Sequence, residues 1–428
     1  MSGGLGLLKR VLTRSLKIQS YAPYERFLQA LAKHEDVWVT ALGPYLAWWR
    51  QRATSKLRIA LSAGVLQAET DLPDAVMEIC PGQWQAATAL TLPCPESDFS
   101  GEVWIAIDPA LELKHLLKEA LEREGILNYV EADSGPFLLS GEVAPTLERM
   151  ARALRETHLD EYHQCILDIR QIVAERLAQH QLPLVRLWYY PCVAGKTIKT
   201  VVSARYDVDR ALTNMPKIWA LEHKYGASST AHMRPFGPFY SQRTIARIAR
   251  HPLCAEVAVH GEFVAHAPLF GGVPEAAAAE RRQLAELTGR EVSGMSLHGG
   301  ELIENNTPEA LRAAVTAGFS YDVSMPPASY YFPYRLESQP GTLEDVYRVR
   351  FGFGDIMVRD YEHYGEVFYR DLMRVFETIH DHHGVFIVLL HPIYFGLGSY
   401  LLNGGNLLRL LRFVPTYFRR LLGAGAKA

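Results

Sequence analysis

The pattern of hydrophobic and polar positions changes in character near residue 195. Before it, residues 24–52 predict two helices joined by a short strand at 36–40, and residues 56–107 predict short strands that Pro and Gly separate. Residues 109–124 and 144–182 have the helical period and are rich in Ala, Leu, Glu and Arg. No set of chemistry-bearing side chains is found in this part of the sequence. It therefore predicts an α+β domain and a helical connector.

From residue 195 onward, short apolar strands alternate with helices, which is typical of βα units built around a parallel sheet. The predicted strands end in acids or histidines, namely Asp207 and Asp209, His260, His298, Asp322 and His391. The carboxyl ends of the strands in a parallel β/α barrel share one edge, and that edge carries the active site. The fold class predicted here is α/β, with these side chains gathered at one edge.

Asp207 and Asp209 follow the strand predicted at 199–206 and stand one residue apart. The period of two in a strand places both carboxylates on the same side, where they repel each other unless a cation or a shared proton separates them. A polar turn explains the same residues, since Asp is common in turns. An Asp and two His with open coordination positions suit a divalent metal such as zinc. The remaining carboxylate and a further histidine could then serve as base and acid.

The amino-acid composition limits the classes of function and the cellular location that we expect for this protein. Lys and Arg number 44 and Asp and Glu number 47, so the formal net charge of −3 gives no indication of a nucleic acid partner. The five cysteines are scattered without CxxC spacing, which argues against a disulfide framework and favours a reducing, cytoplasmic location. No run of about eighteen apolar residues is present, so we predict no transmembrane helix.

Both ends of the chain are basic and amphipathic. No acid precedes Glu25 and none follows Asp381, while Lys and Arg interrupt leucine-rich runs near both termini. Such segments could dock on an anionic surface, which would make the protein peripheral to the inner face of the membrane. The alternative is that both ends pack on the body of the protein and keep their charges solvated.

Four short motifs in order carry a family resemblance. They are Arg205-Tyr206-Asp207-Val208-Asp209, Glu256-Val257-Ala258-Val259-His260-Gly261, Gly318-Phe319-Ser320-Tyr321-Asp322-Val323-Ser324 and Leu389-Leu390-His391-Pro392. Together they resemble the polysaccharide deacetylase (NodB-homology) family, and most of all its branch found with surface-polysaccharide biosynthesis. The resemblance covers roughly residues 195–395.

The resemblance implies a distorted (β/α) barrel with fewer than eight repeats, a divalent metal, most suitably zinc, and removal of N-acetyl groups from sugars. If the roles of the family's residues are transferred to the matching positions of this sequence, Asp207 would be the base, Asp209 and His260 would be metal ligands, and His391 would be the general acid. Asp322 matches a family position that shapes the floor of the site. We count Asp322 among the candidate substrate-binding residues, because the carboxyl edge of the sheet is expected to face the substrate.

Two departures from the family pattern affect this site. The family places a second histidine four residues after the first, and that position here is Val264. The third metal ligand could then be His266 on the following loop or His298, and we prefer His298 because it ends a strand. Ser296 stands where a related stretch carries Arg, which removes a cation that could orient the base.

Other stretches suggest substrate contacts or ancestry. Asp355 is predicted to line the barrel mouth, and Tyr330 lies among aromatic residues that could stack on sugar rings or bury themselves against the barrel. The histidines at 380, 382 and 383 are predicted to cap a helix. Residues 36–50 resemble the closing strand and helix of such a barrel, which would fit a tandem arrangement whose first barrel was lost.

The sequence thus predicts four parts: an amphipathic segment with a barrel remnant (1–55), an α+β accessory domain with a helical connector (56–190), a catalytic barrel (191–396) and a basic tail (397–428). The function predicted is removal of N-acetyl groups from a sugar of a surface polysaccharide or its lipid-linked precursor. A deacetylase-like barrel that binds glycan or a partner without turnover is the alternative. A hydrolase of another C–N bond is the third reading.

Overall fold

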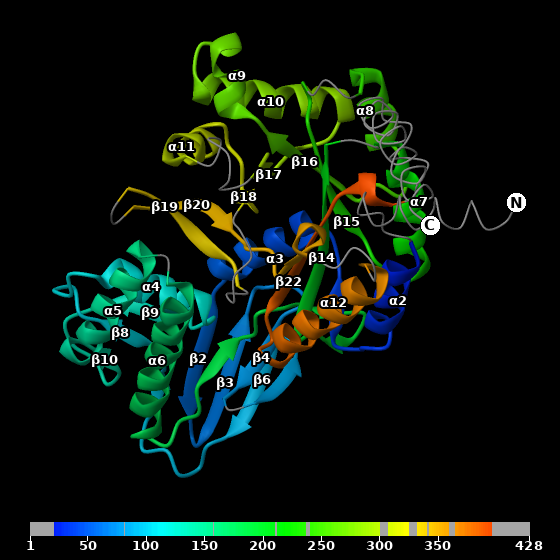
Figure 1. Ribbon diagram of the computed structural model, residues 1–428. Coiled ribbons are helices and arrows are strands. Elements are labelled where there is room, and N and C mark those ends of the chain that lie inside the picture. Colours follow the sequence, from blue (N-terminus) through cyan, green and yellow to red (C-terminus); the bar gives the residue numbers. More distant parts are fainter. Residues whose placement is uncertain are drawn as a thin grey trace, which may run out of the picture. The chain divides into compact units, whose positions relative to one another are not determined.

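The computed structural model describes residues 21–80, 82–156, 158–209, 212–236, 240–299, 307–324, 332–339, 342–358 and 364–395 (Figure 1). Tyr330 and the basic terminal segments lie outside these described residues. The chain divides into two compact units, one formed by Met1–His34, Val39–Gly43 and Val202–Ala428, and the other by Glu35–Trp38 and Pro44–Val201. None of the described helices is both long and apolar enough to cross a membrane.

The first unit is built on one curled, mostly parallel sheet. The strands of this sheet are β1 (Val37–Val39), β14 (Thr200–Val208), β15 (Ser229–Met233), β16 (Glu256–Gly261), β17 (Gly294–Leu297), β18 (Tyr321–Asp322), β19 (Tyr334–Gln339), β20 (Thr342–Arg348), β21 (Phe353–Gly354) and β22 (Val385–Leu390). The first two residues of β1 and of β14 belong to the second unit. Their order is β19-β20-β18-β17-β16-β15-β14-β22-β21, with β1 paired to β14. Neighbours from β14 through β18 to β20 are parallel, as are β21 and β22, whereas β19 and β20 are antiparallel. The mixed α/β class predicted from the sequence is confirmed.

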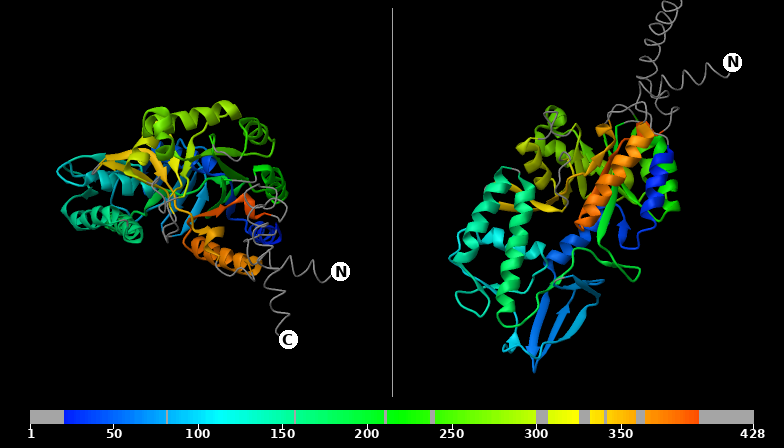
Figure 2. Two further views of the ribbon diagram at one scale, coloured as in Figure 1. Left: turned by 45° about the horizontal axis from the view of Figure 1, so that its top comes forward. Right: turned by 60° about the horizontal axis from the view of Figure 1, so that its bottom comes forward.

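Helices of this unit lie along the sheet (Figure 2). They are α2 (Tyr21–Leu31), α7 (Met215–Lys224), α8 (Gln242–Ala249), α9 (Phe263–Phe270), α10 (Val273–Thr288), α11 (Pro308–Thr316) and α12 (Tyr364–Asp381). Three of these helices have capping residues of the usual kinds. The hydroxyls of Ser241 and Thr307 accept backbone N–H groups three residues on, and Gly289 ends α10 at a φ of 67°.

Some elements differ from the sequence prediction. Helix α9 and the hairpin β19–β20 were not predicted from the sequence. The short strand predicted at 36–40 is β1, and its pairing with β14 makes it part of the sheet described here. This segment therefore contributes to the existing sheet, whatever its ancestry.

The amino end of this sheet is closed by packing. The half-buried carboxylate of Glu256, at the start of β16, accepts hydrogen bonds from Gly43 N at 2.8 Å, Thr230 Oγ1 at 2.6 Å and Tyr321 OH at 2.7 Å. A Cβ at Gly43 would lie 2.3 Å from a Glu256 oxygen, so only glycine allows this approach. These contacts join the amino ends of β15, β16 and β18.

The second unit combines helices with several small sheets. Its helices are α3 (Leu42–Thr54, whose first two residues belong to the first unit), α4 (Lys114–Arg123), α5 (Ala144–Arg155) and α6 (Leu159–Ala178). Its strands are β2 (Leu57–Ser62), β3 (Val65–Thr70), β4 (Val76–Ile79), β5 (Gln83–Ala86), β6 (Ala89–Pro93), β7 (Gly101–Glu102), β8 (Ile105–Ile107), β9 (Tyr129–Glu131), β10 (Leu138–Leu139), β11 (Val185–Leu187), β12 (Cys192–Val193) and β13 (Lys196–Thr197). The division into four parts at residues 55, 190 and 396 stays a prediction.

A buried arginine ties the second unit together. Arg52, with no exposed surface, donates to the carbonyls of Trp188 at 2.7 Å, Leu187 at 2.9 Å and Arg123 at 2.9 Å. Its guanidinium thereby satisfies carbonyl groups at the end of α4 that the helix leaves unpaired.

Candidate metal and acid–base site

Three of the predicted residues meet at the carboxyl edge of the sheet. Asp209 follows β14, His260 lies in β16 and His298 follows β17. His260 Nε2 lies 3.3 Å and His298 Nε2 lies 3.4 Å from the same oxygen, Asp209 Oδ1. The two imidazole rings are nearly perpendicular, with centroids 5.1 Å apart. Parallel pairing of these strands therefore brings the three side chains to one point.

The other ring nitrogen of each histidine is held by a neighbouring side chain. His260 Nδ1 lies 2.9 Å from Ser296 Oγ, and His298 Nδ1 lies 3.1 Å from Glu262 Oε1. A carboxylate can only accept, so Glu262 fixes the His298 tautomer that carries its proton on Nδ1. This leaves the Nε2 lone pair of His298 directed at Asp209. Outer hydrogen bonds of this kind orient histidine ligands in metal sites.

The donor set fits a divalent metal. One ligand atom from each of Asp209, His260 and His298 lies within 4.8 Å of the other two. Asp209 Oδ1 is buried and accepts no hydrogen bond from the described residues, although two imidazole nitrogens face it. Burial raises the pKa of Asp209, but the nearby imidazoles, first of all that of His260, outweigh burial and lower it to about 2. A carboxylate and two imidazoles are ligands that zinc accepts.

Asp207 lies next to this cluster and is held by a cation. Arg205 Nη2 donates to Asp207 Oδ2 at 2.7 Å, and its Nη1 donates to the Val323 carbonyl. The other oxygen, Asp207 Oδ1, lies 3.4 Å from Ser296 Oγ and 3.9 Å from His260 Nδ1. Burial raises the pKa of Asp207, but the Arg205 guanidinium and then His260 outweigh it and hold the pKa well below its usual range. Asp207 is therefore a carboxylate at neutral pH.

His391 follows β22 and is fixed by a buried acid. Asp355, in the short helix η4 (Asp355–Met357), accepts from His391 N at 2.6 Å and lies 2.8 Å from His391 Nδ1 through its other oxygen. Burial lowers the pKa of His391, but the Asp355 carboxylate outweighs burial and raises it to about 9. At neutral pH the imidazolium therefore holds a proton that it can donate.

Two further candidates, Asp355 and Asp322, lie outside the Asp209 cluster in buried positions. Asp355, expected at the mouth, is fully buried as the partner of His391. Asp322 is also fully buried; its oxygens accept from Ser324 N at 2.8 Å and Arg348 Nε at 2.9 Å, and the Ser324 hydroxyl accepts from Leu297 N at 2.7 Å. This chain of contacts shapes the strand end that precedes His298.

His266 is engaged away from the Asp209 cluster. Its Nδ1 lies 2.7 Å from Glu280 Oε1, and its Nε2 lies 3.8 Å from Glu262 Oε2. Of the two alternatives for the third ligand, His298 is the one that the geometry brings to Asp209. Tyr330 lies outside the described residues.

Three contributing residues were missed by sequence reasoning: Arg205, Glu262 and Arg234. Arg234 lies 3.8 Å from Asp209 Oδ1 through Nη1 and contacts Glu262 through Nη2. The signal for one of them was the strand period. Arg205 stands two residues before Asp207 in β14, so the two side chains share a face.

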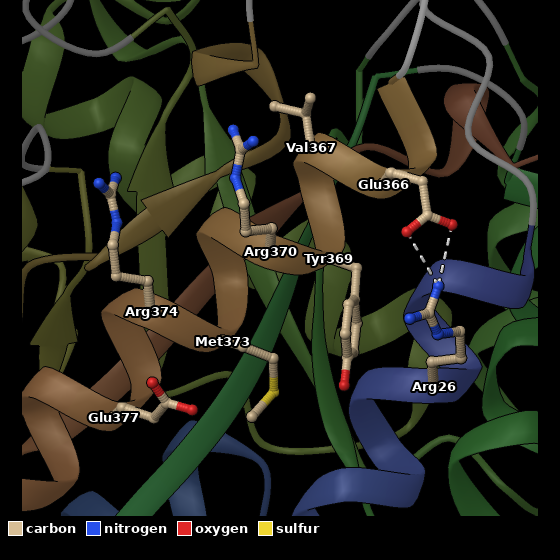
Figure 3. A pocket seen from close by; sticks show the side chains of 8 residues that line it. All are labelled: Arg26, Glu366, Val367, Tyr369, Arg370, Met373, Arg374 and Glu377. Atoms are coloured by element: carbon tan, nitrogen blue, oxygen red, sulfur yellow. Dashed lines mark hydrogen bonds and ion pairs between the residues drawn. The ribbon is translucent and has the colours of Figure 1, made fainter.

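A pocket on the first unit shares no residue with this cluster. It has a volume of about 760 Å³ and lies where α2 and α12 meet, lined by Arg26, Glu366, Val367, Tyr369, Arg370, Met373, Arg374 and Glu377 (Figure 3). Arg26 pairs with Glu366 at 3.0 Å and lies 4.1 Å from the centre of the Tyr369 ring. The side chains that line this pocket include both cations and acids, and they do not form a convergent set of catalytic groups.

The chain resembles solved polysaccharide deacetylases. A putative polysaccharide deacetylase involved in O-antigen biosynthesis from Bordetella bronchiseptica is 18% identical, with a TM-score of 0.29, over 45% of this chain and 72% of that one. A putative polysaccharide deacetylase from Mycobacterium smegmatis is 15% identical, with a TM-score of 0.36, over 50% of this chain and 84% of that one. An allantoinase is 14% identical, with a TM-score of 0.33, over 51% of this chain and 84% of that one.

No family model matches the sequence, and no curated protein matches it. All three TM-scores lie below 0.5, so these similarities carry no argument about the reaction, which must be inferred from the geometry of the site.

Proposed function

We propose that this protein is a metal-dependent hydrolase that removes N-acetyl groups from a sugar of a surface polysaccharide or its lipid-linked precursor. The observation that carries this proposal is the position of His260. Its Nε2 lies 3.3 Å from Asp209 in the metal-binding cluster, and its Nδ1 lies 3.9 Å from the Asp207 carboxylate. A base and a metal site are thereby adjacent, which is the arrangement that hydrolysis of an amide by water requires.

The residues divide into roles. Asp209, His260 and His298 would hold the ion, and zinc suits this donor set. A divalent ion at this position supplies Lewis-acid polarisation of an amide carbonyl and activation of a water molecule. Glu262 and Ser296 orient the two histidines through their Nδ1 atoms.

Proton transfer would be divided between two oppositely charged residues. Asp207, kept ionised by Arg205, accepts a proton from the attacking water as the new C–O bond forms. His391, kept protonated by Asp355, donates a proton to the amide nitrogen as the C–N bond breaks. The products are acetate and the free amine of the sugar.

Some finer assignments belong to the same proposal. The curled sheet would correspond to a distorted (β/α) barrel of fewer than eight repeats, and the second unit would be an accessory domain. Aromatic residues near Tyr330 would contact the sugar, while Asp322 and Asp355 would support the site from buried positions.

A module that binds glycan without turnover is the competing function. It was suggested by the absence of arginine at Ser296 and of histidine at Val264. Arg205 and His298 supply a cation and an imidazole at the corresponding places, which supports the catalytic reading. A hydrolase of another C–N bond would use the same residues and differ only in substrate.

Acetate release from a panel of N-acetylated sugars, measured with zinc present, tests the proposal. Release is expected from the wild type and not from Asp209→Asn, whereas Asp98→Asn, a change of the same kind at an exposed side chain of the second unit, should keep full activity. Zinc binding without acetate release would favour hydrolysis of another C–N bond. No zinc binding and no release from any sugar would overturn the proposal.

A further inference from the structure

Exposed apolar side chains occur on two short helices, α9 and η4, that follow strands of the sheet. Among the described residues, the large hydrophobic side chains with high exposure are Leu269 (75%), Ile356 (40%), Met357 (41%), Val65 (37%) and Val130 (44%). Leu269 lies in α9, which follows β16 and its ligand His260. Ile356 and Met357 lie in η4, which follows β21 and begins with Asp355. Two of these five side chains therefore lie on the segment that carries Asp355, and a third lies on the helix that follows the strand of His260.

Helix α9 is unusual for a helix with exposed residues. Its sequence, Phe-Val-Ala-His-Ala-Pro-Leu-Phe, has no acid, lysine or arginine, although Ala265, Pro268 and Leu269 are exposed. A surface helix of a protein surrounded by water normally presents polar residues on its outer face. Figure 1 shows α9 at the top of the first unit, beyond α10. This apolar face points to a partner that is itself apolar.

The two basic ends of the sequence join the first unit beside the same edge. Tyr21, at the start of α2, packs against Phe395 with ring centroids 5.4 Å apart. Phe395 comes four residues after His391, just past the short helix η5 (Pro392–Tyr394). The sequence that precedes Tyr21 contains Lys9, Arg10, Arg14 and Lys17, and the sequence that follows Phe395 contains Arg409, Arg412, Arg419, Arg420 and Lys427. Neither stretch contains an acid.

We propose that the carboxyl edge of the sheet docks on an anionic lipid bilayer, with Leu269 and Met357 entering the interface. Apolar side chains next to cationic segments are the combination that binds such surfaces. Leu269 and Met357 follow the carboxyl ends of β16 and β21, so docking through them would turn the site toward the headgroups. This inference rests on the proposed function in one respect: it specifies that the sugar is presented on a lipid carrier at the membrane surface.

Co-sedimentation of the full chain with phosphatidylcholine vesicles, with and without phosphatidylserine, tests the docking face. Leu269→Asp and Met357→Asp should each weaken binding to the anionic vesicles about tenfold or more, because a buried apolar side chain is replaced by a charge. Val65→Asp and Val130→Asp introduce the same charge at exposed hydrophobic side chains of the second unit and should leave binding unchanged.

Three results would overturn the inference. The first is wild-type protein that does not bind anionic vesicles, and the second is loss of binding that is equal in all four variants. The double variant Arg370→Glu/Arg374→Glu tests the two arginines that line the pocket of Figure 3. The third result would be loss of binding in this double variant alone, which would show that the docking face is wrong. Acetate release from a water-soluble N-acetyl sugar, measured on the same variants, is expected to stay at the wild-type level. Failure of the docking face can thereby be told apart from failure of the proposed chemistry.

Discussion

Arg205 donates to Asp207 at 2.7 Å from a position two residues earlier on the same strand. This pair answers a question that the sequence raised, because Ser296 stands where a cation for the base was expected. Ser296 is fully buried and lies 3.4 Å from the other oxygen of Asp207. One side of the carboxylate is thus held by a cation and the other by a hydroxyl. The positive charge is present, but it comes from β14 instead of β17.

Moving this arginine tests its role. Arg205→Ala is expected to lower kcat/KM roughly 10²-fold, a part of the 10²–10⁴-fold that a positioned base contributes, with most of the loss in kcat. Adding Ser296→Arg in the Arg205→Ala background should recover part of that loss, because a cation again reaches Asp207 from the neighbouring face. Steady-state kinetics on an N-acetyl sugar measure both effects.

The control for this experiment is Arg205→Lys, which keeps the charge and should retain more activity than the alanine variant. Circular dichroism of each variant shows whether it is folded. If folded Arg205→Ala has wild-type kcat, Arg205 does not act on the base, and the pairing with Asp207 is only structural.

The two candidates for the third ligand make opposite predictions for zinc affinity. His298→Gln should abolish tight binding, because His298 Nε2 lies 3.4 Å from Asp209. His266→Gln should leave affinity close to that of the wild type, because His266 contacts Glu280 and Glu262 instead. Isothermal titration with zinc distinguishes them, and the reverse pattern would contradict the proposed ligand set.

Glu262 provides a finer test in the same titration. Its carboxylate orients His298 without taking part in the cluster itself, so Glu262→Gln should weaken zinc binding by about 10–100-fold. Glu366→Gln, at an exposed acid that pairs with Arg26, is the matched control and should change nothing.

Asp355 sets the alkaline limit of activity through His391. The acid form of His391 is required, and its pKa of about 9 means that the proton is present at neutral pH and is lost as the pH rises through that value. Asp355→Asn removes the charge that raises this pKa, so the alkaline limb of the kcat/KM profile should move to lower pH. A limb in the same place in both proteins would show that His391 is not the titrating acid.

Glu222 gives a pH dependence of stability that is independent of catalysis. Its buried carboxyl accepts from Tyr24 OH at 2.8 Å, Tyr206 OH at 2.7 Å and Ser229 Oγ at 2.6 Å, and burial raises its pKa to about 7. Because the folded pKa exceeds the unfolded value of 4.5, its contribution is complete below pH 4.5 and is lost as the pH rises to about 7.

The expected loss for Glu222 over this range is on the order of 3 kcal/mol. Urea unfolding followed at several pH values measures it as the difference between wild type and Glu222→Gln, which cannot ionise. The stability of the glutamine variant relative to the wild type should rise between about pH 5 and about pH 7.5, because the unfolded carboxyl ionises over this range while the folded one still holds its proton. A constant difference across this range would contradict the assignment.

The sequence predicted the parallel strands and their terminal side chains because both signals are local. A buried strand such as β22 is a continuous apolar run, and a helix such as α11 begins with a capping Thr and a proline. The grouping of Asp209, His260 and His298 then followed from the shared edge of parallel strands.

The supporting partners could not be predicted in the same way. Asp355 reaches His391 across 36 positions of sequence, and His298 and Glu262 are also 36 positions apart. Such pairings depend on register and side-chain direction, which no local pattern specifies. Helix α9 was missed because its apolar residues do not alternate with polar ones, so it has no helical period.

The most direct test of the central claim is to locate the ion. Anomalous diffraction at the zinc edge, from crystals grown with zinc, should give a peak about 2.0–2.2 Å from Asp209 Oδ1, His260 Nε2 and His298 Nε2. A peak bound instead by His266 and Glu280, or no peak at Asp209, would contradict the proposed metal site and the hydrolytic function built on it.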